Sequence, residues 1–234
     1  MAGPWIIVLA MTDGENRIRV VVWSELTEPR LIYPAGIHGA VAAGLSGVDT
    51  GLEISRSSIA GPDLGMGGER LADCDVLVYW SHLKHDDVGA SAVARVAAAV
   101  AERGMGFLAL HSSVDSGIMR SLLGTTCKLG SWREADEPER VKVLLVDHPI
   151  ARGVSDFIIP REEMYGEPWD VPEPEAVVFE SEFGKGERFR SGCCWRIGKG
   201  RVFYFRPGHE TNRSYYQKEV IQVIANGVRW CANR

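Results

Sequence analysis

Short apolar runs, separated by segments of helical character, are the feature that most constrains the fold of this chain. Three of them occur in the first half: IRVVVW (18–23), DVLVYW (75–80) and GFLALH (106–111). A helix is predicted from about Gly36 to Leu45, and an Ala/Val-rich amphipathic helix over residues 86–104. Asp86 or Asp87 is expected to cap the start of the second helix and Gly104 its end. Strands that alternate with helices of this length predict βαβ units and a parallel sheet.

The second half of the chain is instead a succession of strand-like runs joined by short turns. These runs are VKVLLVD (141–147), AVVFESEF (176–183), FRSGCCWRIG (189–198) and RVFYFRP (201–207). The sequence GKG (198–200) is typical of a hairpin, and a last helix is predicted over residues 215–230. We therefore predict an α/β fold with a mixed, mainly parallel sheet flanked by helices, formed as one domain by residues 18–234. Residues 1–17 are expected to be an N-terminal extension or an extra strand.

The charge and the cysteine content argue against several classes of protein. The net charge is −5 and no basic tract is interleaved with aromatic residues, so nucleic acid is not an expected partner. The apolar segment 5–11 is too short to cross a bilayer and lacks the features of a secretory signal, so no membrane association is expected. Five cysteines without a C-x-x-C spacing indicate reduced, buried thiols in a cytoplasmic protein. Cys193 and Cys194 should point to opposite faces of one strand, which argues against a zinc knuckle.

Histidines gather where the predicted strands end. His82, His111 and His209 each follow a strand, and His38 lies near the start of the first helix. Because ligands of open α/β sheets bind outside the carboxyl ends of the strands, we expect these rings to meet at one rim. Converging neutral imidazoles are good ligands for Zn²⁺ or a similar divalent metal, so His38, His111 and His209 form a candidate metal set. The alternative is a cluster of hydrogen-bonded loop histidines. His148, in a turn-like segment, is expected to be structural.

Acidic and aromatic residues concentrate in PREEMYGEPWDVPEP (160–174), which its prolines predict to be an extended loop. Aromatic faces beside carboxylates suit carbohydrate, whose CH faces are apolar and whose hydroxyls need acceptors. One carboxylate, Glu163, is a candidate general base. A second long excursion is predicted over residues 122–137. Candidate substrate-binding residues from these segments and from the strand ends are Glu25, Trp132, Tyr165, Glu167 and Glu210.

Taken together, these segments resemble the ThuA-like family, the trehalose-utilisation proteins. The resemblance rests on YPAGIHGAV, DVLVYWSHLKHDDV, GFLALHSS, LLGTTCKLGSWREADE, REEMYGEPWDVPEPE, FRSGCCWRIGKGRVFYFRPGHET and VIANGVRW, and extends from about Ile18 to the C-terminus. It implies a flavodoxin-like fold of the class I glutamine amidotransferase type. In amidotransferases the tight turn after the equivalent strand presents a cysteine nucleophile, and in this chain that position is His111. Glutaminase activity is therefore not expected.

The resemblance also implies an enzyme of sugar metabolism that acts on trehalose or a 3-keto disaccharide derivative. In this hypothesis a divalent metal polarises the carbonyl of the keto sugar while Glu163 or His82 moves the neighbouring proton, which favours isomerisation, epimerisation or elimination. Hydrolysis between two carboxylates, Glu163 and Glu167, stays open. The candidate catalytic residues are His82, His111, Glu163 and His209.

Other functional hypotheses differ in what they require of the site. A non-catalytic sugar-binding or regulatory protein would retain the fold without the chemistry. A serine nucleophile at Ser112 or Ser113 is disfavoured because the G-x-S-x-G frame is absent. No nucleotide cofactor is expected, and the amphipathic helices leave a homo-oligomer open.

Overall fold

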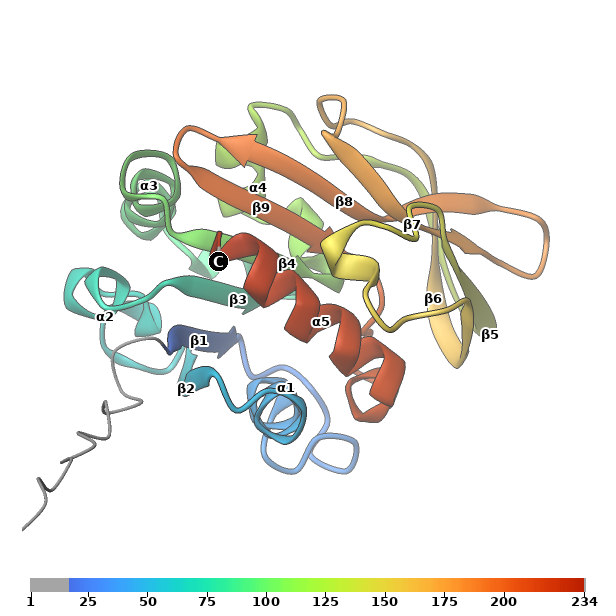
Figure 1. Ribbon diagram of the computed structural model, residues 1–234, viewed down its shortest axis with the longest axis horizontal. Coiled ribbons are helices and arrows are strands. Elements are labelled where there is room, and N and C mark those ends of the chain that lie inside the picture. The colour runs from blue at the N-terminus through green and yellow to red at the C-terminus, as the bar shows by residue number, and fades with distance from the viewer. Residues whose placement is uncertain (1–16, 234) are drawn as a thin grey trace, which may run out of the picture.

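Nine strands form one mixed sheet in the computed structural model, which describes residues 17–233 (Figure 1). Their order across the sheet is β2-β1-β3-β4-β9-β8-β7-β5-β6. The strands are β1 (Ile18–Ser24), β2 (Leu52–Ser58), β3 (Val76–Trp80), β4 (Gly106–Leu110), β5 (Leu129–Val143), β6 (Phe157–Trp169), β7 (Ala176–Glu182), β8 (Arg188–Ile197) and β9 (Gly200–Phe205). The α-helices are α1 (Ile37–Val48), α2 (Gly68–Ala72), α3 (Ala90–Ala98), α4 (Gly117–Leu123) and α5 (Lys218–Cys231). The predicted α/β class is confirmed.

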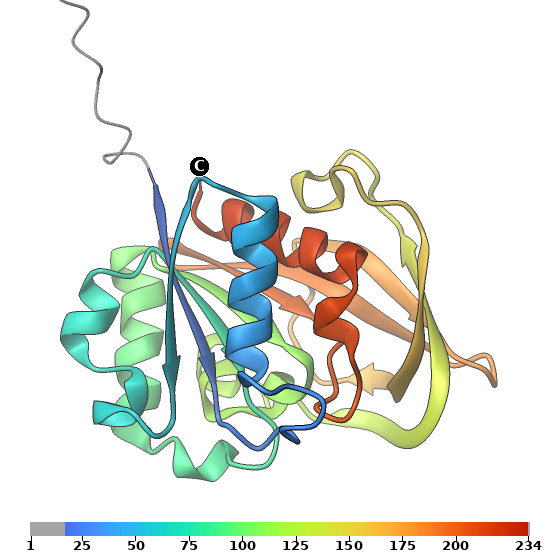
Figure 2. The same cartoon turned by 90° about the horizontal axis from the view of Figure 1, so that it is seen from below.

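The first half of the sheet is parallel and is covered on both faces. Strands β2, β1, β3, β4 and β9 run parallel to one another in that order. Helices α1 and α5 pack side by side on one face (Figure 2), and α2, α3 and α4 pack on the other. Because helices cover both faces, every residue of β3 and β4 is buried. The carboxyl ends of β1, β3, β4 and β9 consequently share one rim of the sheet.

The second half of the sheet is antiparallel, as predicted, but two of its strands were expected to be loops. Segments 122–137 and 160–174 contribute much of β5 and β6, which pair with each other through several register irregularities. Strand β6 is buried without a break over residues 162–166, so it lacks the alternation that marks a half-exposed strand. Its prolines are tolerated because β6 is the edge strand of the sheet. The Gly198-Lys199 hairpin between β8 and β9 is confirmed.

Two short elements were not predicted, and one predicted helix needs correction. Strand β2 was not predicted because it is a largely exposed edge strand with a polar sequence, and α2 is too short to show a periodic pattern. The predicted helix over 86–104 is divided, because Asp86 and Asp87 lie in a separate 3₁₀ turn and Gly89 precedes α3. The cap at the other end is as predicted: Gly104 has a φ of 87°.

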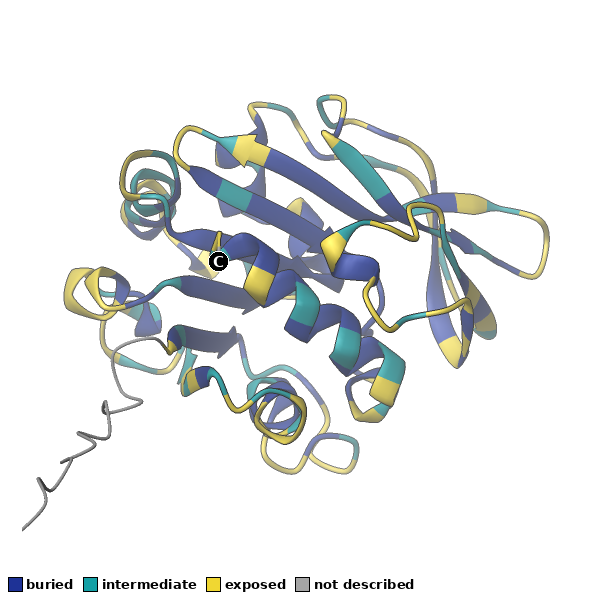
Figure 3. Cartoon of the chain, viewed as in Figure 1, coloured by how far each residue is buried: buried dark blue, intermediate teal, exposed yellow. Residues whose placement is uncertain are grey.

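Burial is concentrated in the central strands and on the inward faces of the helices (Figure 3). All five cysteines are buried and unpaired, as predicted. Cys193 and Cys194 lie in the cores on opposite faces of the sheet, which confirms the prediction from their adjacent positions. Within residues 17–233, no helix has the length and apolarity needed to cross a membrane. The predicted N-terminal extension over residues 1–17 falls almost entirely outside the described residues.

Candidate active site

His111 occupies the tight turn between β4 and α4. Its φ is 52°, in the left-handed region that residues other than glycine rarely adopt. The turn therefore has the strained strand-to-helix geometry that the sequence GFLALHSS predicted. The ring is fully buried, and its Nδ1 donates to the carbonyl oxygen of Arg206 at 3.0 Å. Because a carbonyl only accepts, the neutral form of His111 carries its proton on Nδ1, and its Nε2 accepts from the Tyr165 hydroxyl at 3.4 Å.

His209 follows β9 on a loop that buried groups hold in place. Gly208 has a φ of 126°, and a Cβ at this position would lie 2.0 Å from the hydroxyl oxygen of Tyr215, so the turn requires glycine. The Glu162 carboxylate accepts from the backbone N–H of Gly208 at 2.8 Å and from that of His209 at 3.4 Å. The Nδ1 atom of His209 lies 2.8 Å from the hydroxyl oxygen of Thr211. The loop thus fixes both the backbone and the ring of His209.

His82 lies on the loop after β3, which is organised by Glu25. This fully buried carboxylate accepts from the N–H groups of Leu83 at 2.6 Å and Lys84 at 3.0 Å, and from the hydroxyl of Ser81 at 2.8 Å. Burial raises the pKa of Glu25, but these hydrogen bonds outweigh it and the pKa is lowered overall. Glu25 therefore holds in place the loop that carries His82.

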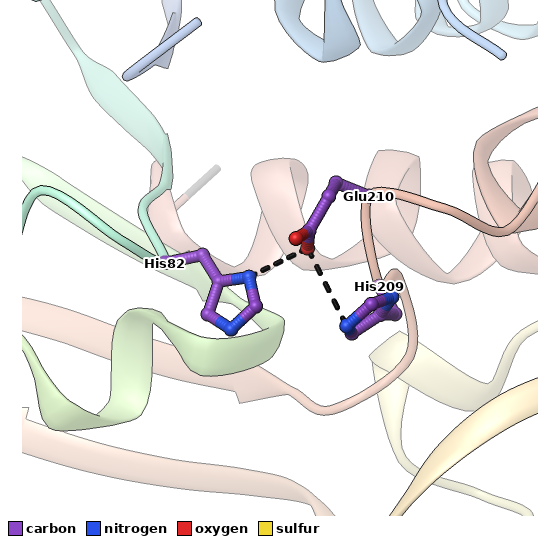
Figure 4. Close-up of side chains that lie close together, drawn as sticks. All are labelled: His82, His209 and Glu210. Carbon is purple, nitrogen blue, oxygen red and sulfur yellow. Dashed lines mark hydrogen bonds and ion pairs between the residues drawn. The ribbon is translucent and has the colours of Figure 1, made fainter. Parts of the chain in front are cut away.

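His82 and Glu210 form a hydrogen-bonded dyad beside His209 (Figure 4). The Nδ1 atom of His82 lies 2.6 Å from Oε2 of Glu210, and the Nε2 atom of His209 lies 3.6 Å from the same oxygen. Burial lowers the pKa of His82, but the hydrogen bond and charge of Glu210 outweigh it and raise the pKa. Burial opposes ionisation of Glu210 as well, yet the pairing brings its pKa to about 2. His209 differs, since burial and the nearby His111 ring lower its pKa.

Strand β6 places the Glu163 carboxylate and the Tyr165 phenol beside the cluster of histidine rings. Oε2 of Glu163 lies 3.2 Å from Nε2 of His111, and it accepts no aligned hydrogen bond from any described residue although it is buried. Burial raises the pKa of Glu163, and the imidazoles of His111 and His209 outweigh that effect and lower it. Tyr165 stacks on His111 with ring centroids 5.3 Å apart. His111 and His209 meet edge to face at the same centroid distance of 5.3 Å.

A buried arginine joins the two halves of the sheet beneath these residues. Arg206, at the end of β9, is fully buried and forms a hydrogen-bonded ion pair with Glu139 on β5. Its guanidinium also lies 3.3 Å from Glu162 and donates to the backbone carbonyl of Glu163. Burial raises the pKa of Glu139 to about 6 despite the arginine. The network holds the antiparallel strands against the histidine rim.

These groups surround a cavity of about 440 Å³, which is within the range of small-molecule sites. The predicted residues that line it are His82, Trp132, Glu163, Tyr165, His209 and Glu210. His111 lies directly behind Glu163 and Tyr165. In the register of β5 and β6, Trp132 is opposite Tyr165 and Glu134 is opposite Glu163. Trp132 is 65% exposed and offers an aromatic surface at the cavity mouth.

Two groups of ligand atoms among the described residues are close enough to share a metal ion. One consists of His111, Glu163 and His209, and the other of His82, His209 and Glu210. Within each group the donor atoms lie within 4.8 Å of one another. The nitrogen and oxygen donors suit Zn²⁺ or a similar divalent metal. The unprotonated Nε2 of His111 lies 3.2 Å from a Glu163 carboxylate oxygen that has no hydrogen-bond donor among the described residues, an arrangement that fits a cation.

The structure places three predicted site residues elsewhere. His38, on α1, bonds to the hydroxyl of Ser24 at the end of β1 and belongs to neither group of metal-ligand atoms. Glu163 joins His111 and His209 in its place. Glu167 forms an ion pair with Arg190 outside the cavity. Glu25, as described above, supports the loop rather than lining the cavity. His148 is structural as predicted, because its ring accepts from the N–H of Ile150.

Sequence reasoning assigned no role to the supporting groups Glu139, Glu162 and Arg206, or to His85, which lines the cavity. His85 follows His82 in a predicted rim loop, so its position was a usable signal. The other three had no local signal, because Arg206 and Glu139 are 67 residues apart in the sequence.

The fold and the residues at the rim define an α/β protein of the amidotransferase type. The tight turn after β4 carries a histidine, His111. The chain belongs to the ThuA family, described as trehalose utilisation, whose profile matches residues 19–231. None of the curated proteins matches it.

Solved structures with the same fold share little sequence identity with this chain. A protein described as ThuA-like from Bacteroides uniformis is 14% identical with a TM-score of 0.68, over 92% of this chain and 91% of that one. A cytoplasmic protein from Salmonella typhimurium is 13% identical with a TM-score of 0.64, over 92% of this chain and 99% of that one. A glutamine amidotransferase from Thermotoga maritima is 10% identical with a TM-score of 0.55, over 93% and 99%. These likenesses establish the fold.

Proposed function

We propose that the cavity is the active site of a cytoplasmic, sugar-metabolising enzyme that transfers protons at a carbon next to a carbonyl group. The substrate class is trehalose or a 3-keto derivative of a disaccharide, which the family description motivates. The observation that carries the proposal is the convergence of His82, His209, Glu163 and Glu210 around one cavity, with His111 in contact with Glu163 and His209 behind it. Such a set provides an acid, a base and metal ligands together.

The two carboxylates are suited to different roles. Glu210 raises the pKa of His82 and so favours its protonated form, and we therefore assign His82 as the general acid. Glu163 has a lowered pKa and remains a carboxylate, so it is the group that accepts the proton from carbon. This pairing of a charged imidazole with an ionised carboxylate across one cavity matches isomerisation, epimerisation or elimination.

A divalent metal would be held by His111, His209 and one carboxylate oxygen of Glu163, whose second oxygen would remain to accept the proton. Bound there, it would act as a Lewis acid that polarises the sugar carbonyl. His111 is already oriented for this role, because its Nδ1–H donates to the Arg206 carbonyl and directs Nε2 toward Glu163.

The lining of the cavity suits a carbohydrate better than glutamine. Trp132 supplies an exposed aromatic face, and the acidic groups supply acceptors for hydroxyls. The carboxylate pair of Glu163 and Glu167 considered for hydrolysis is not formed, because Glu167 pairs with Arg190 outside the cavity. No described cysteine lines the cavity, which argues against glutaminase activity.

The test is turnover of 3-keto-trehalose by the purified protein in Zn²⁺, Mn²⁺ or Mg²⁺, with and without chelator. We expect metal-dependent conversion that falls by about 10²-fold or more in His111→Asn, which tolerates the left-handed backbone but removes Nε2. His148→Asn is the matched control, since its amide oxygen can still accept from Ile150. Sugar affinity without conversion under any metal would instead support a non-catalytic sugar-binding protein.

A further inference from the structure

A second cavity lies on the outer side of the loop that carries His209. It has a volume of about 460 Å³ and extends between β6 and the residues from Thr211 to Gln217. Thr211 lines both this cavity, which we call the arginine groove, and the candidate active site. The two cavities therefore share a wall, the loop over residues 207–214.

The arginine groove has the opposite charge from the candidate active site. The formally charged residues that line it are Arg161 and Arg213, and no described acidic residue lines it. Neither arginine forms an ion pair with any residue in 17–233, although the chain has a net charge of −5. In contrast, the candidate active site is lined by Asp115, Glu134, Glu163 and Glu210. An anion is thus repelled by one cavity and attracted by the other.

The groove orients Arg213 over an aromatic stack. Its guanidinium carbon lies 4.9 Å from the centroid of the Tyr216 ring, which stacks on Tyr33 with centroids 5.3 Å apart. This cation–π contact holds the planar fork in place while its N–H donors stay available. Ile32 and Ile159 add apolar surface to the lining of the groove.

We propose that the arginine groove binds a small organic anion, in which a phosphate or carboxylate group is attached to an apolar or aromatic body. Arg161 and Arg213 bind the anionic group, because guanidinium N–H pairs match the oxygens of phosphate and carboxylate. Tyr216 and the isoleucines pack against the body, and the ligand lies against the loop that carries His209. The proposal is independent of the sugar chemistry proposed for the other cavity.

Calorimetric titration of the full chain with phenyl phosphate, benzoate and inorganic phosphate tests this proposal. We expect saturable binding of the two aromatic anions and at least about tenfold weaker binding of inorganic phosphate. Arg161→Gln/Arg213→Gln should weaken phenyl phosphate binding by about tenfold or more. Arg152→Gln, at an exposed arginine without an ion pair, is the matched control and should bind normally.

A second measurement locates the ligand without relying on variants. Phenyl phosphate should shift the backbone amide NMR signals of Asn212, Ser214 and Gln217, and should do so equally in Glu163→Gln, which disables the candidate active site. Binding that disappears in Glu163→Gln would place the anion in the other cavity and overturn the proposal. Absence of saturable binding, affinity unchanged by the arginine substitutions, or equal affinity for inorganic phosphate would also overturn it.

Discussion

The two halves of the sheet contribute different chemistry to the candidate active site. The parallel half provides the histidines, each placed just beyond the carboxyl end of β3, β4 or β9. The antiparallel half provides Glu163, Tyr165 and Trp132 from within strands β5 and β6. In the parallel half, where helices cover both faces of the sheet, polar residues gather where the strands end, at one rim. The long hairpin of β5 and β6 instead presents side chains along its whole length. The site therefore depends on how the hairpin is held against the rim.

The substitution Glu163→Gln removes the main chemical group that the antiparallel half contributes, and it leaves the histidines of the parallel half in place. The substitution keeps the shape of the side chain but removes both the proposed base and a metal ligand. We expect kcat/KM for the keto sugar to fall by about 10³-fold, together with weaker Zn²⁺ binding in calorimetry. Glu134→Gln, opposite Glu163 on β5 and 56% exposed, should change the rate little. Equal effects of the two substitutions would mean that Glu163 has no special role.

Arg206→Met tests the connection between the halves. The substitution leaves the buried carboxylates of Glu139 and Glu162 without their cation, which should lower the free energy of unfolding by about 3–5 kcal/mol. Urea unfolding at pH 7 measures the effect. Adding Glu139→Gln should restore part of the loss, because it removes one of the two uncompensated charges. Arg188→Met, at an exposed ion pair, should cost about 1 kcal/mol or less.

The two halves also differ in how far the sequence reveals them. The buried parallel strands β1, β3, β4 and β9 were predictable because full burial gives unbroken apolar runs, whereas the exposed edge strand β2 was not. The position of the histidines at one rim follows from the common direction of these strands. The hairpin was not, because β5 is polar and exposed while β6 is buried across 162–166, so neither shows a strand period. Its prolines favoured a loop, although three of the residues proposed from it, Trp132, Glu163 and Tyr165, line the cavity.

Long-range partners explain the remaining errors at the site. His38 lies at the rim, bonded to Ser24 at the end of β1, but the histidine cluster forms over β3, β4 and β9 and does not include it. Nothing in the sequence predicts that Arg206 pairs with Glu139 across 67 residues, since neither lies in a periodic or local motif. The chemistry-bearing residue types were predictable, but the partners that orient them depend on strand pairing.

Glu210→Gln tests the chemistry of the histidine side alone. The substitution removes the charge that raises the pKa of His82, so the alkaline limb of the pH–rate profile should move to lower pH. The rate near pH 7 should fall by about tenfold for each pKa unit lost. Asp115→Asn, at the same cavity, should leave the profile in place. A profile that does not move would mean that His82 is not the acid.

The same substitution has a consequence for folding stability. The pKa of Glu210 is about 2 in the folded protein, below its ordinary value of 4.5. Its ionised form therefore stabilises the folded state above about pH 4.5, and this contribution is lost as the pH falls toward 2. Wild type should be more stable than Glu210→Gln in urea at neutral pH, and the difference should shrink across that acidic interval.

Trp132→Ala is expected to have the smallest effect, and it tests whether the hairpin contributes binding as well as chemistry. Trp132 is 65% exposed, so its removal should change the free energy of unfolding by no more than about 0.5 kcal/mol. If its ring stacks on a sugar, KM should rise by about three- to tenfold, equivalent to about 0.7–1.4 kcal/mol, with kcat unchanged. Trp132→Phe should retain most of the affinity. A fall in kcat without a change in KM would instead place Trp132 among the groups that act on the reacting atoms, and the hairpin would then supply chemistry at both its buried and its exposed positions.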